Sequence, residues 1–161
     1  MTAEMPDTPA VRAAVASGIA FTAAQHEPVN SVAEAAAARG VDIGDLIKTI
    51  VVRRGDNDFV FVLVPGGRVI SWPKLRALLG VNRMSLPDAA EAKAVTGYER
   101  GTITPFGATT AWPVVADERI VGHTVALGGG AHGVALRLAA DDMIAVLGAQ
   151  VADVTDPEPQ R

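Results

Sequence analysis

The sequence predicts a single domain of the α/β class, of α+β type, in which peripheral helices cover a mixed sheet. Three observations predict this fold. The chain has 161 residues, enough for one domain with a hydrophobic core. Apolar, β-branched runs typical of strands are interspersed with capped helical segments. Their order lacks the strict strand–helix–strand alternation of a parallel sheet, which favours a mixed sheet.

The expected helices are recognised by the residues that begin and end them. Thr8 and Pro9 are typical of a first helical turn, and Gly18 of a helix end. Ser31 and Glu34 have the spacing of a capping box. The expected helical segments run from Thr8 to Gly18, Ser31 to Gly40, Ser71 to Gly80, Ser85 to about Val95 with a stop at Gly97, and Asp141 or Asp142 to Leu147.

Strands are expected where β-branched and aromatic residues cluster between turn residues. Residues 46–52 and 59–64 predict an antiparallel hairpin, joined at 55–58 by a loop slightly longer than the tightest type. Further strands are expected over 19–26, 69–70, 112–116, 123–127, 134–138 and near Val151. Residues 100–107 lack periodicity and are framed by glycine and proline, so we expect a shaped loop there.

Composition excludes several functions. The chain has no cysteine, which excludes disulfides, thiolate metal sites and cysteine nucleophiles. A formal net charge of −4 argues against general nucleic-acid binding, although it allows a local basic rim. We see no signal peptide and no apolar run of membrane length, so we expect a cytoplasmic protein that does not enter membranes. The domain is expected over residues 8–154, with flexible tails at 1–7 and 155–161.

Lys48 is the most informative single residue, because it interrupts the apolar run 46–52. An ammonium group is costly to bury without a partner, and its stem reaches only to the rim of a sheet. One interpretation is a structural lysine that pairs with Asp42 or Asp45. The other is a binding-site lysine that faces the glycine-containing loops of the chain.

Two such loops, residues 101–105 and 128–133, can present backbone N–H groups to a phosphate or an ester oxyanion. Neither matches a P-loop or a dinucleotide-binding motif, and residues 128–133 could equally be a flexible hairpin turn. His132 lies in the second loop and could contact a ligand, whereas His26 and His123 are expected to be structural. The histidines lack metal-ligand spacing, and we expect no metal and no cofactor.

Four motifs follow one another along the chain. They are Asp45-Leu46-Ile47-Lys48-Thr49-Ile50-Val51-Val52, Thr96-Gly97-Tyr98 with Gly101-x-x-x-Pro105-Phe106-Gly107, Trp112-Pro113-Val114 with Asp117-Glu118, and Gly128-Gly129-Gly130 leading into Leu136. In this order they resemble the YbaK and prolyl-tRNA-synthetase-associated family of aminoacyl-tRNA deacylases. The resemblance covers residues 9–153 approximately and implies a mixed, mostly antiparallel, curled sheet.

The resemblance also implies a function, which is hydrolysis of the ester of a mischarged aminoacyl-tRNA by a free-standing editing domain. The family's lysine and glycine-x-x-x-proline loop carry over to Lys48, Gly101 and Pro105 as catalytic residues. The expected substrate-binding residues are Phe21, Thr49, Thr102, Ile103, Thr104, Phe106, Gly128, Gly129, Gly130 and His132. An aminoacyl ester is already activated, so the site has to position water and stabilise an oxyanion. We see no side-chain general base, so a group of the substrate could activate the water.

Departures from the family pattern leave the substrate open. Thr49 follows the lysine as in the members that resemble Cys-tRNA(Pro) deacylases, whereas Gly128 stands where those members tend to have serine. We expect tRNA(Pro) charged with cysteine or alanine, bound through its 3′-terminal adenosine and amino acid. The alternatives are a non-catalytic tRNA- or nucleotide-binding module and a protein partner of an aminoacyl-tRNA synthetase.

Overall fold

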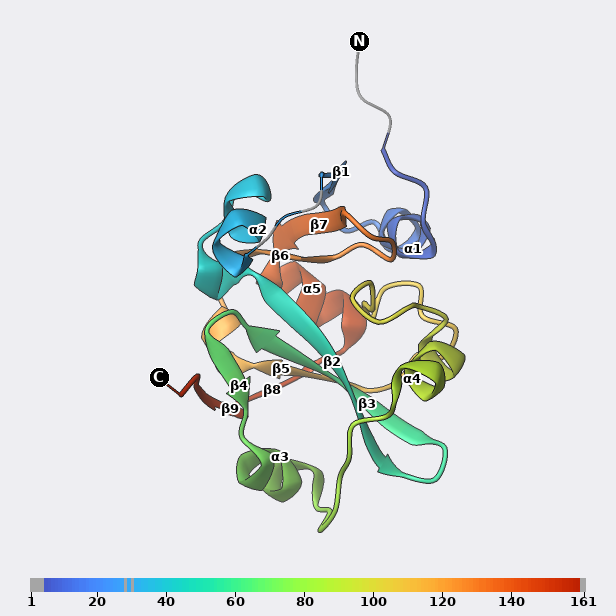
Figure 1. The fold of residues 1–161 in the computed structure, drawn as a ribbon, viewed down its shortest axis with the longest axis vertical. Helices are drawn as coiled ribbons and strands as arrows, with labels where there is room; N and C mark the ends of the chain where they lie inside the picture. The colour runs from blue at the N-terminus through green and yellow to red at the C-terminus, as the bar shows by residue number, and fades with distance from the viewer. Residues whose placement is uncertain (1–4, 28, 30, 160–161) are drawn as a thin grey trace.

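The computed structural model describes residues 5–27, 29 and 31–159, and it contains two main sheets (Figure 1). The first has the antiparallel order β1 (Phe21–Gln25), β7 (Val134–Ala139) and β6 (Thr124–Gly128). The second has the order β2 (Ile47–Gly55), β3 (Asp58–Pro65), β5 (Val114–Asp117) and β8 (Gln150–Ala152). In this sheet β2 and β3 are antiparallel, while β3, β5 and β8 run parallel. The mixed, mostly antiparallel sheet expected from the sequence is therefore confirmed.

Five α-helices lie at the positions predicted from capping residues, with boundaries shifted by a few residues. They are α1 (Pro9–Ser17), α2 (Val32–Ala38), α3 (Trp72–Leu79), α4 (Ala89–Thr96) and α5 (Ala140–Leu147). Thr8 and Ser31 each accept a backbone N–H through the side-chain oxygen, as predicted for caps. The fourth helix begins later than expected, because Asp88 rather than Ser85 is its cap. Two short 3-10 helices, η1 (Ile43–Asp45) and η2 (Glu118–Ile120), complete the helical segments.

The β2–β3 hairpin has a tighter turn than the sequence predicted. Gly55 pairs with Asp58, so only Asp56 and Asn57 form the turn. Asn57 has a φ of 51°, in the left-handed region that asparagine tolerates better than most residues. The register shifts between Arg53 and Gly55, which is a bulge in β2. Gly55 and Asp58, which the sequence pattern places in the loop, instead form the last pair of the two strands.

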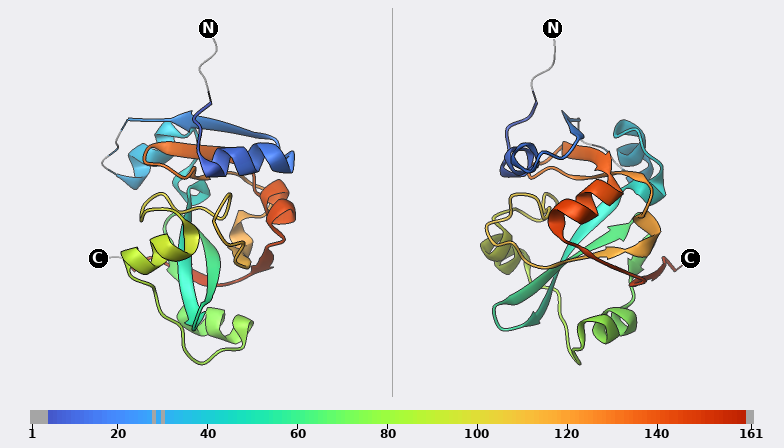
Figure 2. Two further views of the ribbon diagram at one scale, coloured as in Figure 1. Left: turned by 90° about the vertical axis from the view of Figure 1, so that its right-hand side faces the viewer. Right: turned by 180° about the vertical axis from the view of Figure 1, so that it is seen from behind.

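The second sheet divides the hydrophobic core into two parts. On one face Val51, Phe61 and Leu63 pack towards the first sheet and α5. In the right-hand view of Figure 2, from behind, α5 lies in front of the second sheet. On the other face Val52 and Val62 pack against α3, which lies at the bottom of Figure 1. Alternate side chains of one strand thus enter different core regions.

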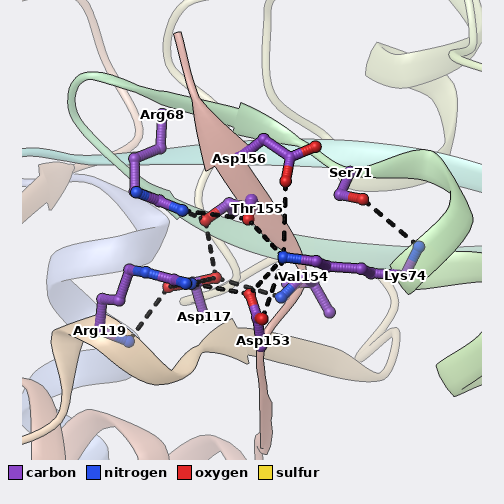
Figure 3. A network of polar contacts seen from close by, with 9 residues as sticks. All are labelled: Arg68, Ser71, Lys74, Asp117, Arg119, Asp153, Val154, Thr155 and Asp156. Atoms are coloured by element: carbon purple, nitrogen blue, oxygen red, sulfur yellow. Dashed lines mark hydrogen bonds and ion pairs between the residues drawn. The ribbon is translucent and has the colours of Figure 1, made fainter.

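The C-terminal segment corrects one prediction. Residues 155–161 were expected to be a flexible tail, but β9 (Thr155–Pro157) pairs with β4 (Arg68–Ile70). Thr155 is fully buried, and its hydroxyl donates to the buried carboxylate of Asp117 at 2.8 Å (Figure 3). Arg68 Nε donates to the same hydroxyl at 2.7 Å. These buried polar contacts, which the sequence pattern does not reveal, hold the segment in place.

No helix in the described part of the chain is long and apolar enough to cross a membrane.

Candidate functional site

A cavity of about 510 Å³ lies beside β2, and its lining residues come from both main sheets. Its wall combines β2 with residues of three loops, the start of α4, the residue that follows α2 and the adjoining ends of β6 and β7. The lining residues are Arg39, Leu46, Ile47, Lys48, Thr49, Ile50, Val51, Leu86, Pro87, Ala89, Ala92, Arg100, Gly101, Ile103, Gly128, Ala131, Gly133 and Val134. Both glycine-containing loops predicted to form a site therefore contribute to this cavity.

The cavity lies along the free edge of β2 rather than over one face, since successive residues from Leu46 to Val51 all line it. β2 is the outermost strand of its sheet. Its outer edge is paired at one end, where Leu46 forms a parallel bridge with Ala126. At the other end Arg53 exchanges two backbone hydrogen bonds with Ser85, at 2.8 and 2.9 Å.

Between these two bridges the edge of β2 is open. The backbone N–H and C=O of Arg53 point away from β3, towards Ser85. Along an antiparallel strand, every second residue points these groups to the same side, so those of Val51 and Thr49 also point away from β3. The hydrogen bond from Gly66 N to Leu46 O agrees with this alternation, because it places the even-numbered positions on the β3 side. Within the described ranges the outward groups of Thr49 and Val51 have no hydrogen-bond partner. The cavity thus contains backbone donors and acceptors on a rigid strand.

The two glycine-containing loops contact one another at the cavity. A side chain on Gly128 would lie 3.4 Å from the carbonyl oxygen of Ile103, so the loops pack backbone against backbone. Gly101 has a φ of 89°, which few other residues adopt, and a side chain there would lie 3.8 Å from His132. Gly129 is held by its N–H to Val134 O at 2.8 Å, and Thr8 Oγ1 donates to its carbonyl at 2.6 Å. The second loop is therefore anchored rather than a free hairpin turn.

Several residues predicted to be catalytic or substrate-binding lie outside the cavity wall. Thr104, Pro105 and Phe106 are buried and are not part of the cavity wall. The Tyr98 hydroxyl donates to Phe106 O at 2.6 Å, and burial raises the pKa of Tyr98 to about 12. Thr102 is also buried, with its hydroxyl donated to Glu99 O at 2.7 Å.

The remaining predicted positions also lie outside the cavity wall. Phe21 pairs with Leu138 in the first sheet and packs on the core. A side chain on Gly130 would lie 2.9 Å from the ring of Tyr98. His132 is exposed and lies 3.5 Å from a carboxylate oxygen of Glu99. Of the predicted site residues, the wall contains Lys48, Thr49, Gly101, Ile103 and Gly128.

Lys48 does not have either of the environments that the sequence suggested. Its cross-strand neighbour is Val64, whose side chain belongs to the α3 side of the sheet. The ammonium donates to Arg68 O at 2.8 Å and lies 3.9 Å from Glu158 Oε1. Lys48 thus forms part of the cavity wall while its ammonium is directed away from the glycine-containing loops.

The proposed pairing of Lys48 with Asp42 or Asp45 is also wrong. Asp45 instead lies 2.7 Å from His123 Nδ1, which agrees with the structural role expected for that histidine. No contact between Asp42 and Lys48 is present in the described structure. The lysine side chain is 42% exposed, so solvent can reach it.

Sequence reasoning missed two arginines in the cavity wall. Arg39 directly follows the last residue of α2 and is partly buried, and desolvation lowers its pKa from the usual value. A basic residue at a helix end is common, so its sequence position gave no signal. Arg100 precedes Gly101, and this adjacency to a predicted site loop could have identified it.

Thr49 carries a further feature that the sequence did not reveal. Its hydroxyl is buried and has no hydrogen-bond partner among the described residues. Elsewhere in the described chain no group of three His, Asp or Glu side chains is placed to hold a metal ion.

Comparison with known proteins gives consistent matches. The model of a family described as the aminoacyl-tRNA editing domain matches residues 26–146. The Enterococcus faecalis protein EbsC, whose assigned name is that of a Cys-tRNA(Pro)/Cys-tRNA(Cys) deacylase, is 26% identical over 134 residues, or 83% of this chain and 80% of EbsC. A proline–tRNA ligase of Desulfovibrio desulfuricans is 36% identical over 95 residues, which cover 59% of this chain but only 16% of the ligase.

A solved structure is similar over almost the whole chain. It is a crystal structure of a protein described as a trans-editing enzyme for prolyl-tRNA synthetase. Its TM-score is 0.85 at 26% sequence identity, and the match covers 94% of this chain and 99% of that one.

Proposed function

Because the chain belongs to the aminoacyl-tRNA editing domain family, we propose that it is an aminoacyl-tRNA deacylase that acts as a free-standing protein on mischarged tRNA. The observation that carries this proposal is the cavity between the open edge of β2 and the two glycine-containing loops. Its volume of about 510 Å³ lies in the range of small-molecule sites and suits an amino acid with its terminal nucleoside.

The reaction is the hydrolysis of an ester. Water adds to the aminoacyl carbonyl, the resulting tetrahedral oxyanion collapses, and the ribose oxygen leaves with a proton. Backbone N–H groups of Gly101, Gly128 and the open edge at Thr49 are the donors that we assign to the carbonyl oxygen and the amino acid. Preorganised donors of this kind each contribute on the order of a hundredfold to the rate. No acidic residue in the described part of the chain lines the cavity, so a ribose hydroxyl or another substrate group is assigned as the proton acceptor.

The amino acid removed is proposed to be small and uncharged. Leu46, Ile47 and Val51 give the strand side of the cavity an apolar surface, and Ile103 continues it from the loop. A charged side chain would lose hydration there without gaining a partner of opposite charge in the apolar part. Cysteine or alanine attached to tRNA(Pro) satisfies this requirement, and the similarity to EbsC supports the same substrate class.

Lys48 is assigned to the terminal phosphate or the ester end of the substrate. To reach it, the ammonium has to leave Arg68 O, an exposed hydrogen bond whose loss costs about 1 kcal/mol. Binding of an anion would compensate for this loss. Thr102, Thr104, Pro105 and Phe106 are assigned to holding the first loop in shape, and Phe21, Gly129, Gly130 and His132 to supporting the second loop and its surroundings.

The test is a deacylation assay with Cys-tRNA(Pro), Ala-tRNA(Pro) and correctly charged Pro-tRNA(Pro). We expect release of cysteine or alanine and little release of proline. Lys48→Ala should lower kcat/KM by roughly tenfold or more, as expected for loss of a charged contact. The matched control is Lys93→Ala, because Lys93 is an exposed lysine outside the cavity wall with only a long contact to Glu99.

Each result decides between the alternatives. Unchanged turnover in Lys48→Ala, with the fold intact by circular dichroism, removes the lysine from the reaction. Binding of the tRNA 3′ end without release of any amino acid indicates a non-catalytic binding module. A stable complex with an aminoacyl-tRNA synthetase in the absence of tRNA affinity indicates a protein partner instead of an enzyme.

A further inference from the structure

The cavity wall has an unusual charge for this protein. The chain contains 14 basic and 18 acidic residues, yet among the described residues the wall contains Arg39, Lys48 and Arg100 and no aspartate or glutamate. The local charge thus has the sign opposite to the net charge of the protein. A cavity that concentrates positive charge attracts anions and disfavours cations.

Arg39 is the clearest part of this pattern. Its side chain is partly buried, and in the described structure it has neither a hydrogen bond nor an ion pair. Four other arginines reach a carboxylate within 3.2 Å, whereas several do not; the four are Arg12, Arg53, Arg54 and Arg119. A partly desolvated guanidinium without a partner is unfavourable unless a ligand supplies the negative charge.

Arg100 adds a second positive charge to the wall from a different element, and this residue is exposed. It lies in the loop that follows α4, next to Gly101, and no described residue pairs with it. Figure 1 shows α2 close to the beginning of β2 and α4 further along, towards the other end of that strand. The two arginines therefore line the cavity from separate elements, and a ligand in the cavity would meet positive charge from both.

We propose that Arg39 and Arg100 bind the phosphodiester groups next to the 3′-terminal adenosine, and so position the aminoacyl ester in the cavity. The inference rests on the proposed function and adds two positioning residues to it. An aminoacyl ester has no carboxylate, and positive charge would repel its α-ammonium group. The phosphodiesters are hence the only anions that such a substrate offers. The planar guanidinium fork matches the oxygens of a phosphate group.

The experiment measures binding and hydrolysis separately in the full chain. Binding is followed by fluorescence anisotropy with an uncharged RNA oligonucleotide that ends in cytidine-cytidine-adenosine, and with adenosine monophosphate as a second probe. The variants are Arg39→Gln and Arg100→Gln. Arg76→Gln is the matched control, because this substitution removes the same charge from an arginine of α3 that lies outside the cavity wall.

We expect each of the two variants to weaken oligonucleotide binding by roughly tenfold, while the control leaves it unchanged. The slope of log K against log salt should fall by roughly 0.7 for each lost phosphate contact on single-stranded RNA. In the deacylation assay KM for charged tRNA should rise more than kcat falls. The rise in KM should be several-fold smaller for aminoacyl-adenosine, which has no phosphate.

Several outcomes would overturn the inference. An equal rise in KM for charged tRNA and for aminoacyl-adenosine would mean that the arginines shape the cavity and do not bind phosphate. An unchanged salt slope in both variants would lead to the same conclusion. Binding of adenosine monophosphate as tightly as the oligonucleotide would assign the site to a free nucleotide. If the oligonucleotide binds as expected but no charged tRNA is hydrolysed, the deacylase assignment fails while the phosphate contacts stand.

Discussion

Replacing Thr49 with valine should make the protein more stable. The Thr49 hydroxyl is buried without a partner in the described structure, whereas in the unfolded chain water hydrates it. Leaving a polar group unsatisfied costs about 1–3 kcal/mol, and valine has nearly the same shape and suits a strand. We therefore expect Thr49→Val to raise the free energy of unfolding by about 1 kcal/mol.

The assay is equilibrium unfolding in urea, followed by far-ultraviolet circular dichroism. With a slope of about 2 kcal/mol per molar urea, the midpoint should rise by about 0.5 M. The matched control is Thr155→Val, the same substitution at a buried hydroxyl that contacts Asp117 and Arg68. That variant leaves the buried carboxylate without one of its donors, so its midpoint should fall by about 1 M.

A midpoint that stays constant or falls in Thr49→Val would refute this reasoning, because it would show that the hydroxyl is satisfied in solution. Activity gives a second readout. A variant that is more stable but has a lower kcat/KM on charged tRNA would show that the unsatisfied hydroxyl is kept for substrate. Unchanged activity would show that the Thr49 hydroxyl does not contact the substrate, and it would leave the proposed contact of the Thr49 backbone N–H in place.

Two further predictions concern the loops and the polar network. In urea unfolding, Gly130→Ala should destabilise the protein by about 1–3 kcal/mol more than Gly122→Ala. Both glycines have a positive φ, but only a methyl group at position 130 would meet a close neighbour, the ring of Tyr98 at 2.9 Å. Equal effects of the two substitutions would contradict this reasoning. Hydrogen bonds from Arg119 and then from Lys74 lower the pKa of Asp153 to about 2, below its unfolded value. The Asp153 carboxylate therefore stabilises the fold above about pH 4, and this stabilisation is lost as the pH falls towards 2. Asp153→Asn should make the free energy of unfolding depend less on pH between about 4 and 2. An unchanged pH dependence in that range would exclude the carboxylate as its cause.

Much of the fold could be predicted because its signals are local. Thr8, Ser31 and Ser71 cap helices through hydrogen bonds that span three residues, and such bonds depend little on the rest of the chain. The β2–β3 hairpin is likewise set by two apolar runs and the turn between them. The turn was predicted too long, since a bulge in β2 depends on contacts of the formed sheet.

The candidate site could be predicted only in part. The motifs identified the two glycine-containing loops, and the structure places Gly101 and Gly128 on one cavity with Thr49. The direction of the Lys48 ammonium was not predicted, because it depends on Arg68, whose strand β4 is fixed by pairing with the C-terminal strand β9. Arg39 could not be identified as a cavity residue, because its sequence neighbours do not show what lies across the cavity.

The sequence by itself thus determined the helices, most of the strands and the family, since capping bonds, side-chain alternation and short motifs act between near neighbours in the chain. Only the tertiary structure decided which edge of β2 stays unpaired, where the Lys48 ammonium points and which cations line the cavity. Those features depend on residues that are far apart in sequence, such as Leu46 and Ala126 or Arg53 and Ser85. Their relative positions are fixed only when the sheets assemble and the core is packed.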